Sequence, residues 1–172
     1  MVKKKKSSKR SPWNKGRTVG SREPFSPSDV TRIKALLTRR SKAGLRDLAL
    51  FSTAIDTMLN MPDLVGLTVK DARKRNRVMR DTVELVSSRR GKIRCSLSKA
   101  TIRVLEKWIN YSDKKQNDYL FTGRLSLGKT ALSPRQVSRL VKAWATGIGL
   151  EAASYGTNSL RRSRAIKYKS RR

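Results

Sequence analysis

The residues best suited to chemistry lie near the end of the chain, in the segment Tyr155-Gly156-Thr157-Asn158-Ser159-Leu160-Arg161-Arg162. A helical pattern from Ser133 to Gly147 precedes this segment, and its glycine marks a tight loop before a second helix that opens at Thr157. A helix start presents unpaired N–H groups and a positive dipole end, so arginines in its first turn favour an anion such as phosphate. The alternative is an ordinary helix cap followed by solvated arginines.

The overall charge also indicates an anionic partner. The 172 residues include 42 Lys and Arg against 12 Asp and Glu, a formal net charge of +30. An excess of this size predicts a polyanionic partner, with nucleic acid as the first candidate. No apolar run approaches the length of a membrane span, so we expect no membrane partner.

The chain contains no histidine and a single cysteine, Cys95. These counts exclude an intramolecular disulfide and remove the usual ligands of structural zinc, so we expect no metal and no cofactor. The commonest general acid or base is missing too, which leaves Lys, Arg, Tyr or a carboxylate for any proton transfer. The basic N-terminus lacks the apolar core of a secretory signal, and the predicted location is cytoplasmic, associated with the nucleoid.

A second informative segment runs from Leu45 to Asp71 and reads LRDLALFSTAIDTMLNMPDLVGLTVKD. It begins as an apolar helix and breaks at the polar stretch 60–63, where Pro62 permits only a fresh helical turn. Residues 64–67 then run into a possible strand.

In this order and at this separation, the two segments resemble the catalytic domain of the tyrosine recombinases, the phage-integrase family. There the first segment commonly ends in L-R-x-S/P-[DE]-L-[LV]-x-L, which residues 59–67 match except that Asn60 replaces the arginine. The second commonly reads Y-G-T-H-S-L-R-R, which residues 155–162 match except that Asn158 replaces the histidine. The resemblance covers roughly Ser26 to Tyr168.

The resemblance implies a metal-free transesterification, in which a tyrosine attacks a backbone phosphate while two arginines hold its oxygens. Arg161 matches the second arginine, whereas Asn60 cannot form the guanidinium fork at the first position. Asn158 can donate a hydrogen bond but cannot carry a proton. The family's hairpin lysine falls at Arg89 or Lys92, of which only Lys92 can release a proton.

The family's last motif, L-L-G-H followed by the nucleophilic tyrosine, is expected after Tyr168, and the sequence stops at Arg172 without it. We therefore expect a DNA-binding protein of the integrase family, related to DNA integration and site-specific recombination but catalytically inactive as it stands. One alternative is an active subunit that takes its tyrosine in trans. Another is a basic RNA-binding or ribosome-binding protein. Self-association or association with a full-length recombinase is a further expectation.

Hydrophobic periodicity predicts a mainly helical α+β fold with one small antiparallel sheet. The resemblance implies that this fold is a tyrosine-recombinase-like catalytic core. A disordered basic arm is expected over residues 1–25, and the core domain, without the final motif and nucleophile, over 26–172. Gly44 is predicted to separate the first two helices. The predicted elements are helices from Pro27 to about Arg40, from Leu45 to Leu59, after Ser98, from Ser133 to Gly147 and from Thr157, and a hairpin from Val78 to Leu97.

Basic residues outside the two motifs are candidates for DNA contact. Arg135, Arg139 and Lys142 are four and three residues apart, a spacing that places them in one stripe on a helix. The other candidates are Arg73, Lys74 and Arg75 in a basic loop, and Arg162 beside the matched arginine.

Overall fold

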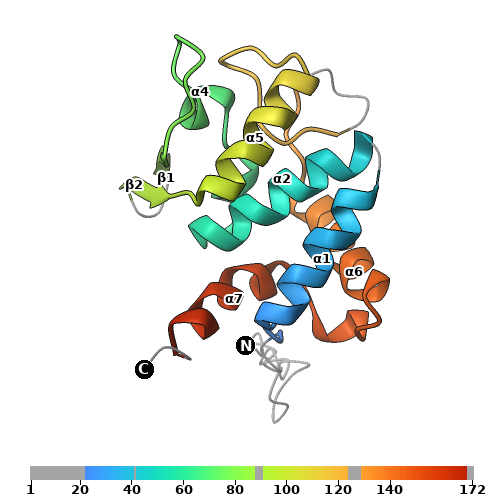
Figure 1. Ribbon diagram of the computed structural model, residues 1–172. Coiled ribbons are helices and arrows are strands. Elements are labelled where there is room, and N and C mark those ends of the chain that lie inside the picture. Colours follow the sequence, from blue (N-terminus) through green and yellow to red (C-terminus); the bar gives the residue numbers. More distant parts are fainter. Residues whose placement is uncertain (1–21, 41, 88–90, 124–128, 170–172) are drawn as a thin grey trace, which may run out of the picture.

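The computed structural model describes residues 22–40, 42–87, 91–123 and 129–169 (Figure 1). Most of the predicted basic arm and Arg89 lie outside these ranges. The elements are α1 (Pro27–Arg39), α2 (Lys42–Thr57), α3 (Met61–Val65), α4 (Val69–Ala72), β1 (Thr82–Ser87), β2 (Gly91–Ser96), α5 (Lys99–Tyr111), α6 (Pro134–Gly147), the short 3-10 helix η1 (Ala152–Ser154) and α7 (Thr157–Lys169). The predicted α+β class, mainly helical with one small antiparallel sheet, is confirmed.

Helix α2 runs through the middle of the molecule and packs against α1, α5, α7 and β2 (Figure 1). Its residues 46–55 are all buried, so its polar side chains find partners inside the protein. Thr53 Oγ1 donates to the carbonyl of Ala49 at 2.8 Å, and Arg46 pairs with Asp47 at 2.7 Å. These bonds satisfy polar groups that are costly to bury alone.

Gly44 lies inside α2, so the prediction that it separates the first two helices was wrong. A Cβ atom at this position would lie 2.4 Å from the carbonyl oxygen of Leu37 and 2.6 Å from Cβ of Arg40. The glycine therefore allows the chain leaving α1 to approach α2 closely, a packing role that its sequence neighbours do not reveal.

Side-chain caps fix the starts of four helices. Ser26, Ser98 and Ser133 accept hydrogen bonds from backbone N–H groups at the starts of α1, α5 and α6. Asn60 does the same for α3, with its Oδ1 atom 2.8 Å from the N–H of Asp63. The polar residues that predicted helix starts in the sequence therefore act as caps.

Residues 64–67 were expected to run into a strand, but the element that follows them is the helix α4. Leu64 and Val65 belong to α3, and α4 follows after a single turn. The extended pairing that remains is an isolated bridge between Thr68 and Tyr119, next to a 2.7 Å bond from Leu120 N–H to the Leu67 carbonyl. The Asn60 cap and Pro62 in the first turn of α3 favour a helical start over an extended one.

The predicted hairpin is present but shorter than expected. Strands β1 and β2 are antiparallel, with Glu84 opposite Arg94 and an ion pair of 2.8 Å between them. Cys95 is half-buried on β2. Residues 73–81 form a separate loop, closed by a bridge between Arg73 and Met79.

The C-terminal half is fastened to the rest by residues 22–25, which we call the N-terminal strap. Phe25, assigned to the basic arm from the sequence, is completely buried and stacks on Tyr155 with ring centroids 4.6 Å apart. Its N–H donates to Ser163 Oγ at 2.9 Å, and Glu23 N–H donates to the Ser154 carbonyl at 2.9 Å. The strap therefore joins the start of α1 to η1 and α7.

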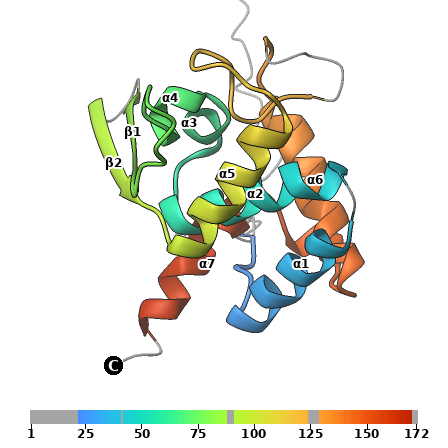
Figure 2. The same ribbon diagram turned by 45° about the horizontal axis from the view of Figure 1, so that its top comes forward.

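Figure 2 shows α7 on the side of α2 that faces away from α4 and the loop after α5. Helix α7 also packs against α6 and α1. Within the described ranges, no helix is both long and apolar enough to cross a membrane.

Replacing Asn60 tests its role as a cap. We expect Asn60→Ala to lower the free energy of unfolding by about 1 kcal/mol, because the N–H of Asp63 loses its acceptor. Asn60→Ser, which keeps an acceptor, should retain most of that stability. Urea unfolding followed by circular dichroism measures both, and equal losses in the two variants would show that the cap is unimportant.

Candidate nucleic-acid interface

The start of α7 lacks a side-chain cap. Gly156 precedes the helix and offers only its backbone, which exchanges hydrogen bonds with Ser159: Gly156 N–H donates to Ser159 Oγ at 3.0 Å, and Ser159 N–H donates to the Gly156 carbonyl at 2.9 Å. In the described part of the chain, no group accepts from the N–H of Thr157 or Asn158. Within the described ranges, two backbone donors at the positive end of α7 therefore have no acceptor.

The side chains of this turn divide between core and solvent. Ser159 and Leu160 are buried, whereas Asn158 and Arg161 are exposed. Neither exposed side chain makes a hydrogen bond or ion pair with another described residue. The buried pair holds the turn in place, and the exposed pair presents an amide and a guanidinium beside the available N–H groups.

Arg162 has a structural contact that the sequence did not predict. Its Nη1 atom donates to the carbonyl of Arg22 at 2.7 Å, and the Arg22 guanidinium in turn donates to the carbonyl of Ala153. The aliphatic part of Arg22 lies over Gly156, where a Cβ atom would be 3.5 Å from Cγ of Arg22. Arg162 thus ties the strap to the turn that carries Asn158 and Arg161.

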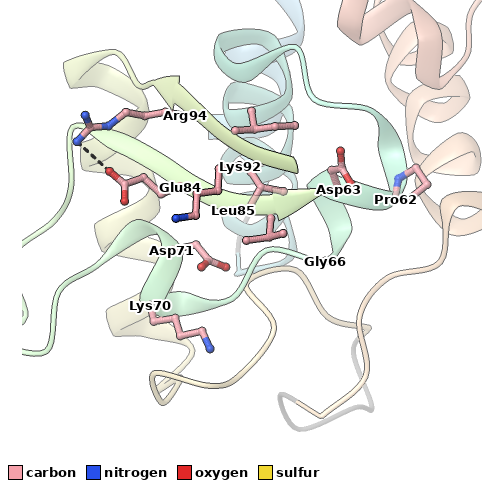
Figure 3. A pocket seen from close by; sticks show the side chains of 11 residues that line it. Pro62, Asp63, Gly66, Lys70, Asp71, Glu84, Leu85, Lys92 and Arg94 are labelled. Carbon is pink, nitrogen blue, oxygen red and sulfur yellow. Dashed lines mark ion pairs between the residues drawn. The ribbon is translucent and has the colours of Figure 1, made fainter. Parts of the chain in front are cut away.

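A separate hollow of about 890 Å³ lies between the hairpin and the α3–α4 segment (Figure 3). Lys92 lines it from β2, while Asp63, Lys70 and Asp71 line it from α3 and α4. Asn60 lies at the beginning of α3, with its amide oxygen engaged in the cap. The hairpin tip with Arg89 is outside the described residues.

The structure brings Lys92 and α3 to the same hollow, and it places Asn158 and Arg161 together on α7. Across the described ranges, no hydrogen bond or ion pair joins Asn60 or Lys92 to the α7 pair. Among the described residues that line the hollow, none belongs to α7.

Asp63 is a candidate that the sequence reading did not single out. Its Oδ2 atom is buried without a hydrogen-bond partner in the described structure, and the residue lines the hollow opposite the hairpin. A buried carboxylate oxygen without a donor is costly, which makes Asp63 a candidate for contact with a polar ligand. The signal in the sequence was an acidic residue directly after Pro62, at a helix start.

The other predicted DNA contacts are accessible. On α6, Arg135, Arg139 and Lys142 are exposed, and the opposite face buries Val137, Val141 and Trp144. The predicted basic stripe is thus a solvent-facing surface of α6. In the loop after α4, Lys74 and Arg75 are exposed, and Arg73 is half-buried.

The tyrosines offer no evident nucleophile near this turn. Tyr155 is buried against Phe25, and its pKa is raised by burial first and then by the negative charges of Glu23 and Asp29. A phenol in this position resists ionisation, so it is a poor attacking group. Tyr111 is at the end of α5 and Tyr119 follows the loop after it, while the Tyr168 side chain is outside the described residues.

Among the described residues, no three acidic or cysteine side chains lie close enough together to hold a metal ion.

Solved structures with a similar fold are recombinases. The XerH site-specific recombinase bound to palindromic difH substrate has 18% sequence identity and a TM-score of 0.68, covering 88% of this chain and 44% of that one. The XerA recombinase has 14% identity and a TM-score of 0.70, with coverages of 87% and 50%. The Tn1549 transposon integrase in complex with circular intermediate DNA has 14% identity and a TM-score of 0.63, with coverages of 90% and 54%.

This chain spans about half the length of those structures, and at these identities the likeness concerns the fold. A comparison with curated proteins found no match. The profile described as "Phage integrase family" matches residues 25–170, which is most of the sequence. The family resemblance noted in the two sequence motifs is thereby confirmed, and the chain belongs to the phage integrase family.

Proposed function

We propose that this chain binds double-stranded DNA through the start of α7 and does not cleave DNA on its own. The observation that carries the proposal lies in the first turn of α7, where the exposed side chains of Asn158 and Arg161 accompany two N–H groups that have no acceptor among the described residues. A backbone phosphate fits this arrangement, because its oxygens accept from N–H groups and from a guanidinium fork.

Surface charge supports a polyanion as the ligand. The sequence carries a net charge of +30, and α6, which packs against α7, exposes Arg135, Arg139 and Lys142. Contacts of this kind position a protein along a phosphate backbone without reading bases. Duplex DNA is favoured over RNA because similar folds have been solved with DNA bound, namely XerH with difH and the Tn1549 integrase with circular intermediate DNA.

The proposed lack of cleavage rests on two substitutions. Asn60 stands where the family motif has an arginine, and Asn158 stands where it has a histidine. Removal of one group that stabilises charge in a transition state costs about 3 kcal/mol, and neither asparagine supplies a charge or carries a proton. The buried Tyr155 offers no substitute nucleophile. Binding without turnover is the expected result, in a protein that occupies recombination sites on the nucleoid.

Strand cleavage provides the first test. We expect no covalent adduct when the protein is incubated with nicked duplexes and run on a denaturing gel. A tyrosine-linked product formed by this chain alone would contradict the proposal.

A second cleavage experiment tests whether the protein can use a tyrosine that another subunit supplies. The Asn60→Arg/Asn158→His variant is combined with a tyrosine-bearing recombinase whose own arginines have been replaced. Cleavage only in that mixture would indicate a subunit that receives its nucleophile in trans. No cleavage in the mixture agrees with a protein that binds and does not cut.

DNA affinity provides the second test. Arg161→Ala should weaken duplex binding by about 1 to 3 kcal/mol, because one charge-assisted phosphate contact is lost. The matched control is Arg39→Ala, an exposed arginine at the end of α1. Fluorescence anisotropy at several salt concentrations measures both, with a slope of about −0.9 per phosphate contact on duplex DNA.

The same measurement separates DNA from RNA. Wild type is expected to prefer duplex DNA over structured RNA at equal salt. Equal affinity for the two nucleic acids, or equal loss of affinity in the Arg161 and Arg39 variants, would contradict the proposal. The protein would then bind nucleic acid only through its overall positive charge.

A further inference from the structure

A second hollow, lined mainly by basic residues, lies between the loop after α4 and the end of α5. It has a volume of about 680 Å³ and is lined by the basic residues Arg73, Arg75, Arg77, Lys114 and Lys115. Two acidic residues, Glu106 and Asp113, also line it, so the basic side chains are in excess. An excess of positive charge around a concave surface concentrates anions there.

Backbone and side-chain bonds hold the two walls of this hollow together. Gln116 Nε2 donates to the Lys74 carbonyl at 3.2 Å, and Lys70 N–H donates to the Gln116 carbonyl at 3.0 Å. The loop after α4 is itself closed by a 2.8 Å bond from Lys74 N–H to the Val78 carbonyl. The basic side chains thus extend from a backbone that is held by hydrogen bonds. This reduces the entropy cost of ordering them around a ligand.

The arginines of the hollow have no acidic partner in the described structure. Among the described residues, the arginines that form ion pairs are Arg32, Arg46 and Arg94, and none of them lines this hollow. Arg73 Nη1 donates to Asn110 Oδ1 at 3.0 Å, but its Nε atom is buried with no acceptor among the described residues. An anion in the hollow would bring oxygen acceptors to a guanidinium that is incompletely satisfied.

Lys114 lies deeper in the wall. Its Nζ atom donates to Thr122 Oγ1 at 2.9 Å and lies 5.7 Å from the centre of the Trp108 ring. Burial lowers the pKa of Lys114, and the nearby charge of Asp118 opposes that effect. A bound anion would act in the same direction as Asp118 and favour the charged lysine.

This hollow is separate from the candidate interface on α7. Figures 1 and 2 both place α2 between α7 and the two loops that form the hollow. A ligand in the hollow is therefore not held by the first turn of α7.

We propose that the hollow between Arg73, Arg75, Arg77 and Lys115 binds a phosphate group of a nucleic-acid backbone, as a second contact apart from α7. The nature of the ligand rests on the proposed function, whereas the preference for phosphate rests on the guanidinium groups themselves. Arginine forks match phosphate oxygens, and unpaired arginines around a hollow are suited to such a group. The protein then contacts nucleic acid on two sides of α2.

The test uses Trp108 as a local reporter. The indole N–H of Trp108 donates to the Leu120 carbonyl at 2.8 Å and shares its surroundings with Lys114, while Trp144 is buried against Phe51. In the ¹H–¹⁵N spectrum of the full chain, a short DNA duplex and inorganic tripolyphosphate are each expected to shift the Trp108 indole signal. The signal is assigned by its loss in Trp108→Phe.

Matched double variants connect that shift to the hollow. Arg75→Gln/Arg77→Gln should abolish it and weaken duplex binding about tenfold more than Arg103→Gln/Lys107→Gln, a difference of about 1.4 kcal/mol. The control pair removes the same charge from exposed positions of α5 that do not line the hollow.

Three results would overturn the proposal: no Trp108 shift with DNA, a shift that survives in Arg75→Gln/Arg77→Gln, or equal loss of affinity in both pairs. If tripolyphosphate shifts the Trp108 signal and the DNA duplex does not, nucleic acid is rejected as the ligand. The two proposals can fail separately. If Arg161→Ala weakens duplex binding no more than Arg39→Ala does, while Arg75→Gln/Arg77→Gln weakens it more than its control pair, the α7 interface is rejected and the hollow is supported.

Discussion

The fold depends on the burial of α2 along most of its length. Residues 46–55 of this helix are buried, and its neighbours α1, α5 and α7 each pack against it. Its end is also fixed to α5, because Asp56 Oδ2 accepts from the N–H of the cap residue Ser98 at 2.8 Å. A helix enclosed in this way orients α3, which follows it directly, and α7, which packs against it.

The candidate interface on α7 depends in turn on the N-terminal strap. The Phe25–Tyr155 stack and the bonds from Arg162 and Phe25 fix the turn that precedes and opens α7. The exposed residues Asn158 and Arg161 are therefore presented from an anchored turn, although their own side chains have no partner in the described structure. An anchored turn lowers the cost of organising a phosphate contact. The anchored turn presents hydrogen-bond donors to the solvent, which agrees with the proposed role in binding DNA.

The sequence predicted those features that depend on local chemistry. Helix caps at Ser26, Ser98 and Ser133, the hairpin, and the basic stripe on α6 were all readable from residue type and spacing. Features that depend on distant contacts were missed. Gly44 was read as a break because its close contact with Leu37 comes from the packing of two helices. A strand was expected after residues 64–67 because short apolar runs suit either structure, and α4 forms there instead. The strap bonds of Arg162 and the basic hollow join segments far apart in the chain, so no local pattern reveals them.

A crystal structure of the protein bound to a short DNA duplex would test the central claim most directly. The account predicts a backbone phosphate at the start of α7, with its oxygens within hydrogen-bonding distance of the Arg161 guanidinium and the backbone N–H of Asn158. A duplex bound elsewhere on the protein, with the first turn of α7 open to solvent, would contradict it.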